Sequence, residues 1–280
     1  MITIEEEIIK IFFEVDNKLK EKEYKEAINI KISNSEIITL SIAKELIYKG
    51  TDKDFYRTIS ENYKYLFPNL PHYSKVLKRI KKLSYQIQEI FKIVLEEKKQ
   101  IYLDTMPIEI VLGVRCNQSK VVREFYRYGI KPDWGHCESK KKKYFGFKLV
   151  ALCYESKIID YILVSAKLSE QASFMKFVKE KNLKNLNIFG DKGFQMSESD
   201  RKILEKRCIK LEIPPKKNLK NPPKVDDLYF KIRARRVIET VFGQLNETFK
   251  INDFVLRSVL GFTSFIVRKI ASYNFKQIYL

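Results

Sequence analysis

Residues 144–164 read Tyr-Phe-Gly-Phe-Lys-Leu-Val-Ala-Leu-Cys-Tyr-Glu-Ser-Lys-Ile-Ile-Asp-Tyr-Ile-Leu-Val, and this stretch decides the fold. Two runs rich in β-branched and aromatic residues, 144–154 and 158–164, stand on either side of a polar tripeptide. Runs of this composition around a short polar loop predict two antiparallel strands joined as a hairpin. An all-helical chain is thereby excluded.

Shorter apolar runs on both sides of the hairpin predict further strands, and helical periodicity predicts helices between and after them. The further strands are expected at 101–103, ending at Asp104, at 186–189 and at 209–213. The helices are expected at 170–181, 198–206, 226–249 and 259–277. This order, a three-strand antiparallel meander followed by α/β crossovers, predicts an RNase H-like α/β domain.

The first hundred residues carry a different pattern. Apolar residues recur at helical spacing, Ser33 offers an N-cap to the helix that follows it, and Gly50 offers a stop. A long helix is expected over 72–97. The chain is therefore expected to divide into an all-helical N-terminal region, 1–98, and the RNase H-like domain, 99–280.

The chain is strongly basic, with 54 Lys and Arg against 35 Asp and Glu. Residues 1–100 contain 19 basic and 16 acidic groups, whereas residues 101–280 contain 35 and 19. The excess of positive charge over residues 101–280 suits binding of a polyanion such as double-stranded DNA, because Lys and Arg neutralise phosphates and release counterions. The candidate contacts form one run, Lys140, Lys141, Lys142 and Lys143. Taken alone, such a run is more typical of a solvated surface, but the excess of basic groups over the whole of residues 101–280 favours a polyanion.

The four cysteines form no C-x-x-C pair, which fits neither a zinc cassette nor a disulfide framework and indicates a reducing compartment. No apolar run approaches the ~20 residues that a membrane helix needs, and the acidic N-terminus is unlike a signal peptide. We therefore expect a cytoplasmic, nucleoid-associated protein with no membrane partner.

Three carboxylates occupy informative places in the expected layout. The first and fourth strands of an RNase H-like sheet are neighbours, so Asp104 and Asp191 are expected to meet, and Glu239 could reach them from a packed helix. Clustered carboxylates repel one another unless cations neutralise them, and oxygen ligands favour Mg²⁺ or Mn²⁺. Two such ions would support cleavage of a phosphodiester.

Each carboxylate also has a purely structural interpretation. Asp104 could cap the end of a strand, and Asp191 could belong to an ordinary glycine-rich loop. Glu239 could pair with Arg235 one helical turn before it. The predicted positions of all three within one basic segment favour a site.

Five blocks, in order, resemble bacterial and archaeal insertion-sequence transposases. They begin at Ile101, Lys143, Gly190, Pro215 and Arg236 and read Ile-Tyr-Leu-Asp-Thr-Met-Pro, Lys-Tyr-Phe-Gly-Phe-Lys-Leu, Gly-Asp-Lys-Gly-Phe, Pro-Lys-Lys-Asn and Arg-Val-Ile-Glu-Thr-Val-Phe. The chain is similar to the DDE transposases of the insertion-sequence nine-eight-two family. The resemblance implies that Asp104, Asp191 and Glu239 are a metal-binding DDE triad. It also implies a homodimer that acts on the element's terminal inverted repeats and on target DNA.

Two positions depart from the family pattern. Val150 stands where the family commonly has His, and Ser169-Glu170-Gln171 stands where it has a His-Asp or Asp-Asp pair. Both changes leave the triad intact. Two rival interpretations stay open: a diverged or domesticated copy that only binds DNA, and an RNase H-like nuclease that cuts without joining strands.

Further DNA contacts are expected from Lys192, beside Asp191, and from Arg235 and Arg236, one turn before Glu239. In the helical region, residues 36–49 and 54–66 could form a helix-turn-helix that reads the terminal repeats. A role in dimerisation or packing is the alternative for these two helices.

Overall fold

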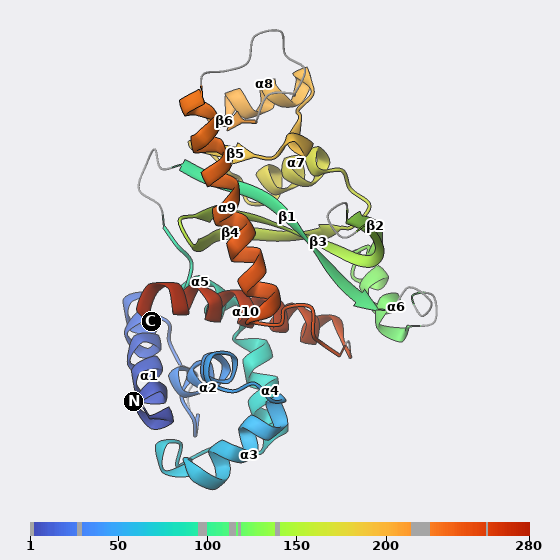
Figure 1. Ribbon diagram of the computed structural model, residues 1–280. Coiled ribbons are helices and arrows are strands. Elements are labelled where there is room, and N and C mark those ends of the chain that lie inside the picture. Colours follow the sequence, from blue (N-terminus) through green and yellow to red (C-terminus); the bar gives the residue numbers. More distant parts are fainter. Residues whose placement is uncertain are drawn as a thin grey trace. The chain divides into compact units, whose positions relative to one another are not determined.

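Figure 1 shows a computed structural model of the chain. It describes residues 3–26, 30–94, 100–111, 116, 119–137, 141–213, 225–255 and 257–280, and over 225–235 it describes the helix but not the side chains. The chain forms two compact units. We call residues 1–92 together with 260–280 the helical unit, and residues 93–259 the sheet unit.

The described residues of the helical unit are mostly helical (Figure 1). They are α1 (Ile4–Glu21), α2 (Asn34–Ile47), α3 (Asp52–Asn62), the 3-10 turn η1 (Lys64–Leu66), α4 (Tyr73–Lys82), α5 (Ser84–Ile90) and α10 (Val259–Tyr279). Local signals explain where these helices begin. The amide of Glu36 donates to Ser33 Oγ at 3.0 Å and the amide of Ser33 donates to Glu36 Oε2 at 2.6 Å, which confirms the predicted N-cap.

The last helix, α10, completes the core of the helical unit. Its residues Val267, Ala271 and Phe275 are buried in one cluster with residues of α1, α2 and α5. The Phe275 ring packs edge-on against Phe91 at 5.5 Å between centroids, and Asn274 Nδ2 donates to Phe91 O at 3.2 Å. The expected boundary at residue 98 assigned this helix to the α/β domain. The structure instead places it in the helical unit, because its apolar face is buried there.

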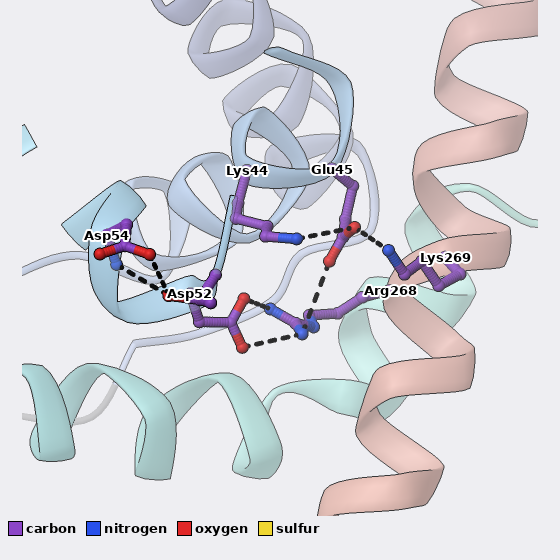
Figure 2. Close-up of polar contacts among 7 residues, drawn as sticks. Lys44, Glu45, Asp52, Asp54, Arg268 and Lys269 are labelled. Carbon is purple, nitrogen blue, oxygen red and sulfur yellow. Dashed lines mark hydrogen bonds and ion pairs between the residues drawn. The ribbon is translucent and has the colours of Figure 1, made fainter. Parts of the chain in front are cut away.

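A buried ionic cluster joins α10 to the end of α2 and the start of α3 (Figure 2). Arg268 donates to the two carboxylate oxygens of Asp52 at 3.1 and 3.2 Å and lies 3.5 Å from Glu45, which also binds Lys269. Burial alone would raise the pKa of Asp52, but the charge and hydrogen bonds of Arg268 outweigh burial and lower it. Buried charges must be paired, so the cluster fixes the position of α10 in its unit.

The sheet unit alternates strands and helices. They are β1 (Gln100–Val111), α6 (Lys120–Arg127), β2 (Asp133–Cys137), β3 (Lys142–Tyr154), β4 (Lys157–Ser165), α7 (Glu170–Glu180), β5 (Leu186–Gly190), the 3-10 turn η3 (Lys192–Phe194), α8 (Glu198–Lys206), β6 (Ile209–Glu212) and α9 (Val225–Glu247). Within the residues described, no helix is long and apolar enough to span a bilayer.

One mixed sheet organises this unit, with the strand order β2-β3-β1-β5-β6 and with β4 also paired to β3. The pairs β1–β3, β2–β3 and β3–β4 are antiparallel, whereas β1–β5 and β5–β6 are parallel. The predicted hairpin of residues 144–164 is confirmed as β3–β4. One face of the sheet shares a buried core with α7 and α8, and α9 packs against β1.

Four elements differ from the sequence predictions. Helix α6 and strand β2 were not predicted, and the expected helix over 72–97 is two helices that meet at Leu83. Ser84 Oγ donates to the carbonyl of Lys81 at 2.9 Å, a side-chain bond that competes with continuation of α4. Strand β1 does not end at Asp104 but continues to Val111. It tolerates Pro107 because only β3 pairs with β1 beyond Leu103.

Candidate active site

The ladder between β1 and β5 places two of the three expected carboxylates side by side. Leu103 pairs with Gly190 in this parallel ladder, so Asp104 and Asp191 are the next residues on two neighbouring strands. The Asp191 backbone is still extended, with φ −73° and ψ 171°. Because neighbouring strands lie about 4.8 Å apart, the two carboxylates start from adjacent positions at the end of β5.

The Asp104 carboxylate leaves the sheet on the face opposite the α7–α8 core. Leu103 belongs to that core, and side chains alternate along a strand, so Asp104 points the other way. Met106, two residues after Asp104 on the same face, accepts a hydrogen bond at Sδ from Asn246 of α9 at 3.3 Å. Asp104 therefore faces the side of the sheet on which α9 packs.

The loop that carries Asp191 is held by buried aromatic packing. The amide of Phe194 donates to the carbonyl of Asp191 at 3.0 Å, which closes the 3-10 turn. The Phe194 ring is fully buried and meets Phe174 of α7 at 6.2 Å between ring centroids, nearly perpendicular to it. The Gly-Asp-Lys-Gly-Phe block thus serves to anchor one carboxylate at the end of β5.

A further acid, Glu170 at the start of α7, lies against this loop. A Cβ added to Gly193 would fall 1.3 Å from Glu170 Oε2, so the carboxylate occupies the space that any side chain at position 193 would need. Burial raises the pKa of Glu170, the Lys148 ammonium lowers it and the Asp191 charge raises it, with a net increase. Lys148 is half-buried and donates from Nζ to the carbonyl of Leu168 at 2.7 Å.

Helix α9 carries Glu239, and asparagines fix the end of this helix on β1. Asn252 Nδ2 donates to Asn246 Oδ1 at 2.7 Å and to Pro107 O at 3.3 Å, and Asn252 Oδ1 accepts from the amide of Glu109 at 3.2 Å. Glu239 precedes Asn246 by two helical turns and therefore lies on the same side of α9, with an exposed side chain.

A metal site made by the complete triad would need the side chains of Asp104, Asp191 and Glu239 to lie close together. In the ranges of the chain that are described, no three or more His, Cys, Asp or Glu side chains are placed to hold a metal ion. Glu239 is therefore not brought into one ligand group with Asp104 and Asp191. The adjacent pair Asp104 and Asp191 does offer the hard oxygen donors that Mg²⁺ and Mn²⁺ prefer.

The expected phosphate-binding residues lie on several surfaces. Lys141, Lys142 and Lys143 are exposed around the start of β3, and Lys142 Nζ binds Glu109 Oε2 at 2.7 Å. Lys192 is exposed in η3 and Arg236 is exposed on α9. Lys140 and the Arg235 side chain lie outside the described residues.

The two helices expected to form a helix-turn-helix correspond to α2 and α3. Helix α2 has eight buried residues and is a core helix of its unit. Helix α3 has acidic residues in its first turn, Asp52 and Asp54. Helix α4, by contrast, has no acidic residue, and its lysines Lys75, Lys78 and Lys82 are exposed. Of these three helices, α4 therefore has exposed positive charge without a neighbouring acid on the same helix.

A comparison with protein families bears on what this arrangement does. The sequence model of the family described as the transposase DDE domain matches residues 118–275, more than half of the chain. The chain belongs to this DDE transposase family. The match includes Asp191 and Glu239 and begins after Asp104, and it does not distinguish the nine-eight-two family from others. Searches among curated proteins and among solved structures gave no significant match.

Sequence reasoning did not select Lys148 and Glu170 as site residues of this DDE transposase. Lys148 is a single charge within the apolar run of β3, and that isolation was the available signal. Glu170 stood at a position singled out as a departure from the family pattern, but an acid in the first turn of a helix is ordinary and did not by itself indicate a site. Val150, the position of the expected His, is fully buried in the α7–α8 core, where an apolar residue packs well.

Proposed function

We propose that the protein is a transposase that cleaves double-stranded DNA at the terminal inverted repeats of an insertion sequence and joins the freed 3′-hydroxyl to target DNA. The observation that carries this proposal is the β1–β5 register, which sets Asp104 and Asp191 on adjacent positions in a chain of the DDE transposase family. We further propose an RNase H-like catalytic domain, a homodimer on DNA, a nucleoid location and membership of the nine-eight-two family.

Asp104 and Asp191 would hold the divalent cation, Mg²⁺ or Mn²⁺, and Glu239 would join them from α9 when DNA is bound. Bound divalent cations supply Lewis-acid activation of the scissile phosphate and of the attacking oxygen. Asp104 keeps its orientation through the amide of Thr105, which donates to Oδ1 at 2.7 Å. Asp191 is fixed through Phe194, and Lys192 beside it offers an ammonium to the DNA backbone.

Substitution of the two aspartates tests the proposal. We expect Asp104→Asn and Asp191→Asn each to reduce nicking of a supercoiled plasmid that carries the terminal repeats to the metal-free background. An amide keeps the shape of the side chain but is a weaker ligand for a hard cation. DNA affinity should stay equal or rise, because a negative charge facing the phosphates is removed.

The matched control is Glu180→Gln, which neutralises an exposed acid in the last turn of α7 and should leave nicking unchanged. If both aspartate variants nick the plasmid at the wild-type rate, the carboxylate pair is not the active site. Product analysis separates the rivals: a nuclease yields nicked DNA without joined strands, and a copy that only binds DNA leaves the plasmid supercoiled with Mg²⁺ present.

A further inference from the structure

The sheet unit contains a groove at the point where two strands follow one another along the same edge of β3. Strand β4 ends at Ser165, opposite Phe147, and β2 begins at Asp133, opposite Gly146. The groove at this junction has a volume of about 710 Å³. That volume lies within the roughly 300–1,000 Å³ of sites for small ligands, which suits one or two nucleotides and excludes a duplex.

The groove is cationic. Three ammonium groups line it, those of Lys143, Lys148 and Lys167, and its described lining includes no acidic side chain. Lys167 lies 4.0 Å from Asp133 in an exposed pair, which is weak enough for a phosphate to replace. Lys148 is held in place by its hydrogen bond to Leu168 O. Three positive charges at one concave surface suit successive phosphates of a strand.

The groove is also aromatic. Trp134 lines it and is 46% exposed, although one edge of its ring packs on Phe145 at 5.6 Å between centroids. Gly135 allows the opposite wall to approach, because a Cβ there would lie 2.7 Å from Ala166 Cβ and 2.8 Å from Ala166 O. An exposed indole beside lysines is the combination with which proteins bind unpaired nucleotides, since a base can stack only when its face is free.

One wall of the groove reaches the loop that carries Asp191. Ser169 lines the groove, and the next residue, Glu170, lies against Gly193, two residues after Asp191. Lys148, whose charge acts on Glu170, belongs to both places. A strand that occupies the groove therefore leaves it beside the loop that carries Asp191.

We propose that this groove binds a single-stranded stretch of the DNA substrate, with phosphates on Lys143, Lys148 and Lys167 and an unpaired base against Trp134. The inference rests on the proposed function and names the part of the DNA that the sheet unit holds beside the loop that carries Asp191. Duplex DNA is held elsewhere on the protein.

Tryptophan fluorescence measures occupancy of this groove directly, because Trp134 is the only tryptophan of the chain. We expect a short single-stranded oligonucleotide to quench Trp134 emission of the full-length protein saturably, without added metal. Lys143→Ala and Lys167→Ala should each shift the midpoint to higher concentration by a few-fold. The matched control, Lys179→Ala, changes an exposed lysine of α7 outside the groove and should leave the midpoint unchanged.

Binding of labelled DNA, followed by anisotropy, supplies the second readout. Trp134→Ala should weaken single-strand binding about tenfold, the scale of one base–aromatic stack, whereas Trp134→Phe should retain most of the affinity and shows that the fold persists. Duplex affinity should be the same in the wild type and in both Trp134 variants.

These experiments distinguish a failure of the groove proposal from a failure of the proposed function. If labelled single strands bind while Trp134 emission stays that of the free protein, the groove proposal is overturned and the proposed function survives. Equal losses of single-strand and duplex affinity in Trp134→Phe would also overturn it, because the effect would then not be local. If neither kind of DNA binds by either readout, the proposed function fails and this inference fails with it.

Discussion

At the scale of single residues, the contact between Glu170 and Gly193 controls the surroundings of Asp191. The carboxylate fills the space in front of Gly193, and it is the end of a flexible side chain on another element. A larger residue at position 193 therefore has to displace Glu170 before it can be accommodated. The loop after β5 and the start of α7 are coupled through this contact, in addition to the packing of Phe194 on Phe174.

A double-mutant cycle measures that coupling. We expect Gly193→Ala to lower the free energy of unfolding by about 1–3 kcal/mol through overpacking, and to reduce nicking because the Asp191 loop moves. In a Glu170→Ala background the same substitution should cost little, since the obstructing carboxylate is gone. Urea unfolding of the four proteins gives the interaction energy. Equal costs in both backgrounds would show that the two residues are not coupled.

At the scale of elements, the ionic cluster of the helical unit predicts a large effect from one arginine. Arg268→Met leaves Asp52 and the buried Glu45 without their shared partner, so we expect a loss of about 3–5 kcal/mol in unfolding free energy at neutral pH. The control is Arg57→Met in α3, which removes an exposed pair with Asp54 and should cost roughly 0–1 kcal/mol.

The same cluster predicts a pH dependence. The pKa of Asp52 is lowered in the fold from its ordinary value of 3.8, so its stabilisation is present above that value. It is lost as the pH falls through the folded pKa. We expect the wild type to lose stability in this acidic range and Arg268→Met to show a shallower decline. Parallel slopes in the two proteins would contradict the assigned role of Arg268.

The exposed lysines of α4 lead us to expect that this helix contacts duplex DNA. Replacing Lys75, Lys78 and Lys82 by Ala should weaken duplex binding and flatten its salt dependence, by about 0.9 in the log–log slope for each phosphate that is no longer neutralised. The matched comparison is Lys53→Ala with Arg57→Ala in α3, the helix expected from sequence to read the repeats. If the α3 variant loses more affinity than the α4 variant, the sequence prediction holds and α4 is only solvated.

At the scale of the whole molecule, the chain leaves the helical unit after residue 92 and returns to it at residue 260. We expect residues 1–98 alone to lack cooperative unfolding, because Val267, Ala271 and Phe275 would be missing from their core. Residues 1–92 joined to 259–280 by a flexible linker should unfold cooperatively. Urea titration followed by circular dichroism compares the two, and a cooperative transition in the shorter fragment would refute the prediction.

The sequence by itself determined the elements whose signals are local. The β3–β4 hairpin follows from composition around a short loop, the start of α2 from Ser33 and Glu36, and the basic character from residue counts. The expectation that Asp104 and Asp191 lie on neighbouring strands also came from strand order, and the β1–β5 register agrees with it. These features depend on residues close together in the chain or on a sheet topology with few alternatives.

The tertiary structure alone decided what depends on long-range packing. Strand β1 extends past Asp104 because β3 pairs with it, although the local sequence with Pro107 does not favour a strand. Helix α10 joins the helical unit because its apolar face and Arg268 find their partners there. The contact of Glu170 with Gly193, and the groove beside Trp134, arise from segments that meet only in the fold. No local pattern encodes such meetings, because the free energy that selects them comes from burial between distant residues.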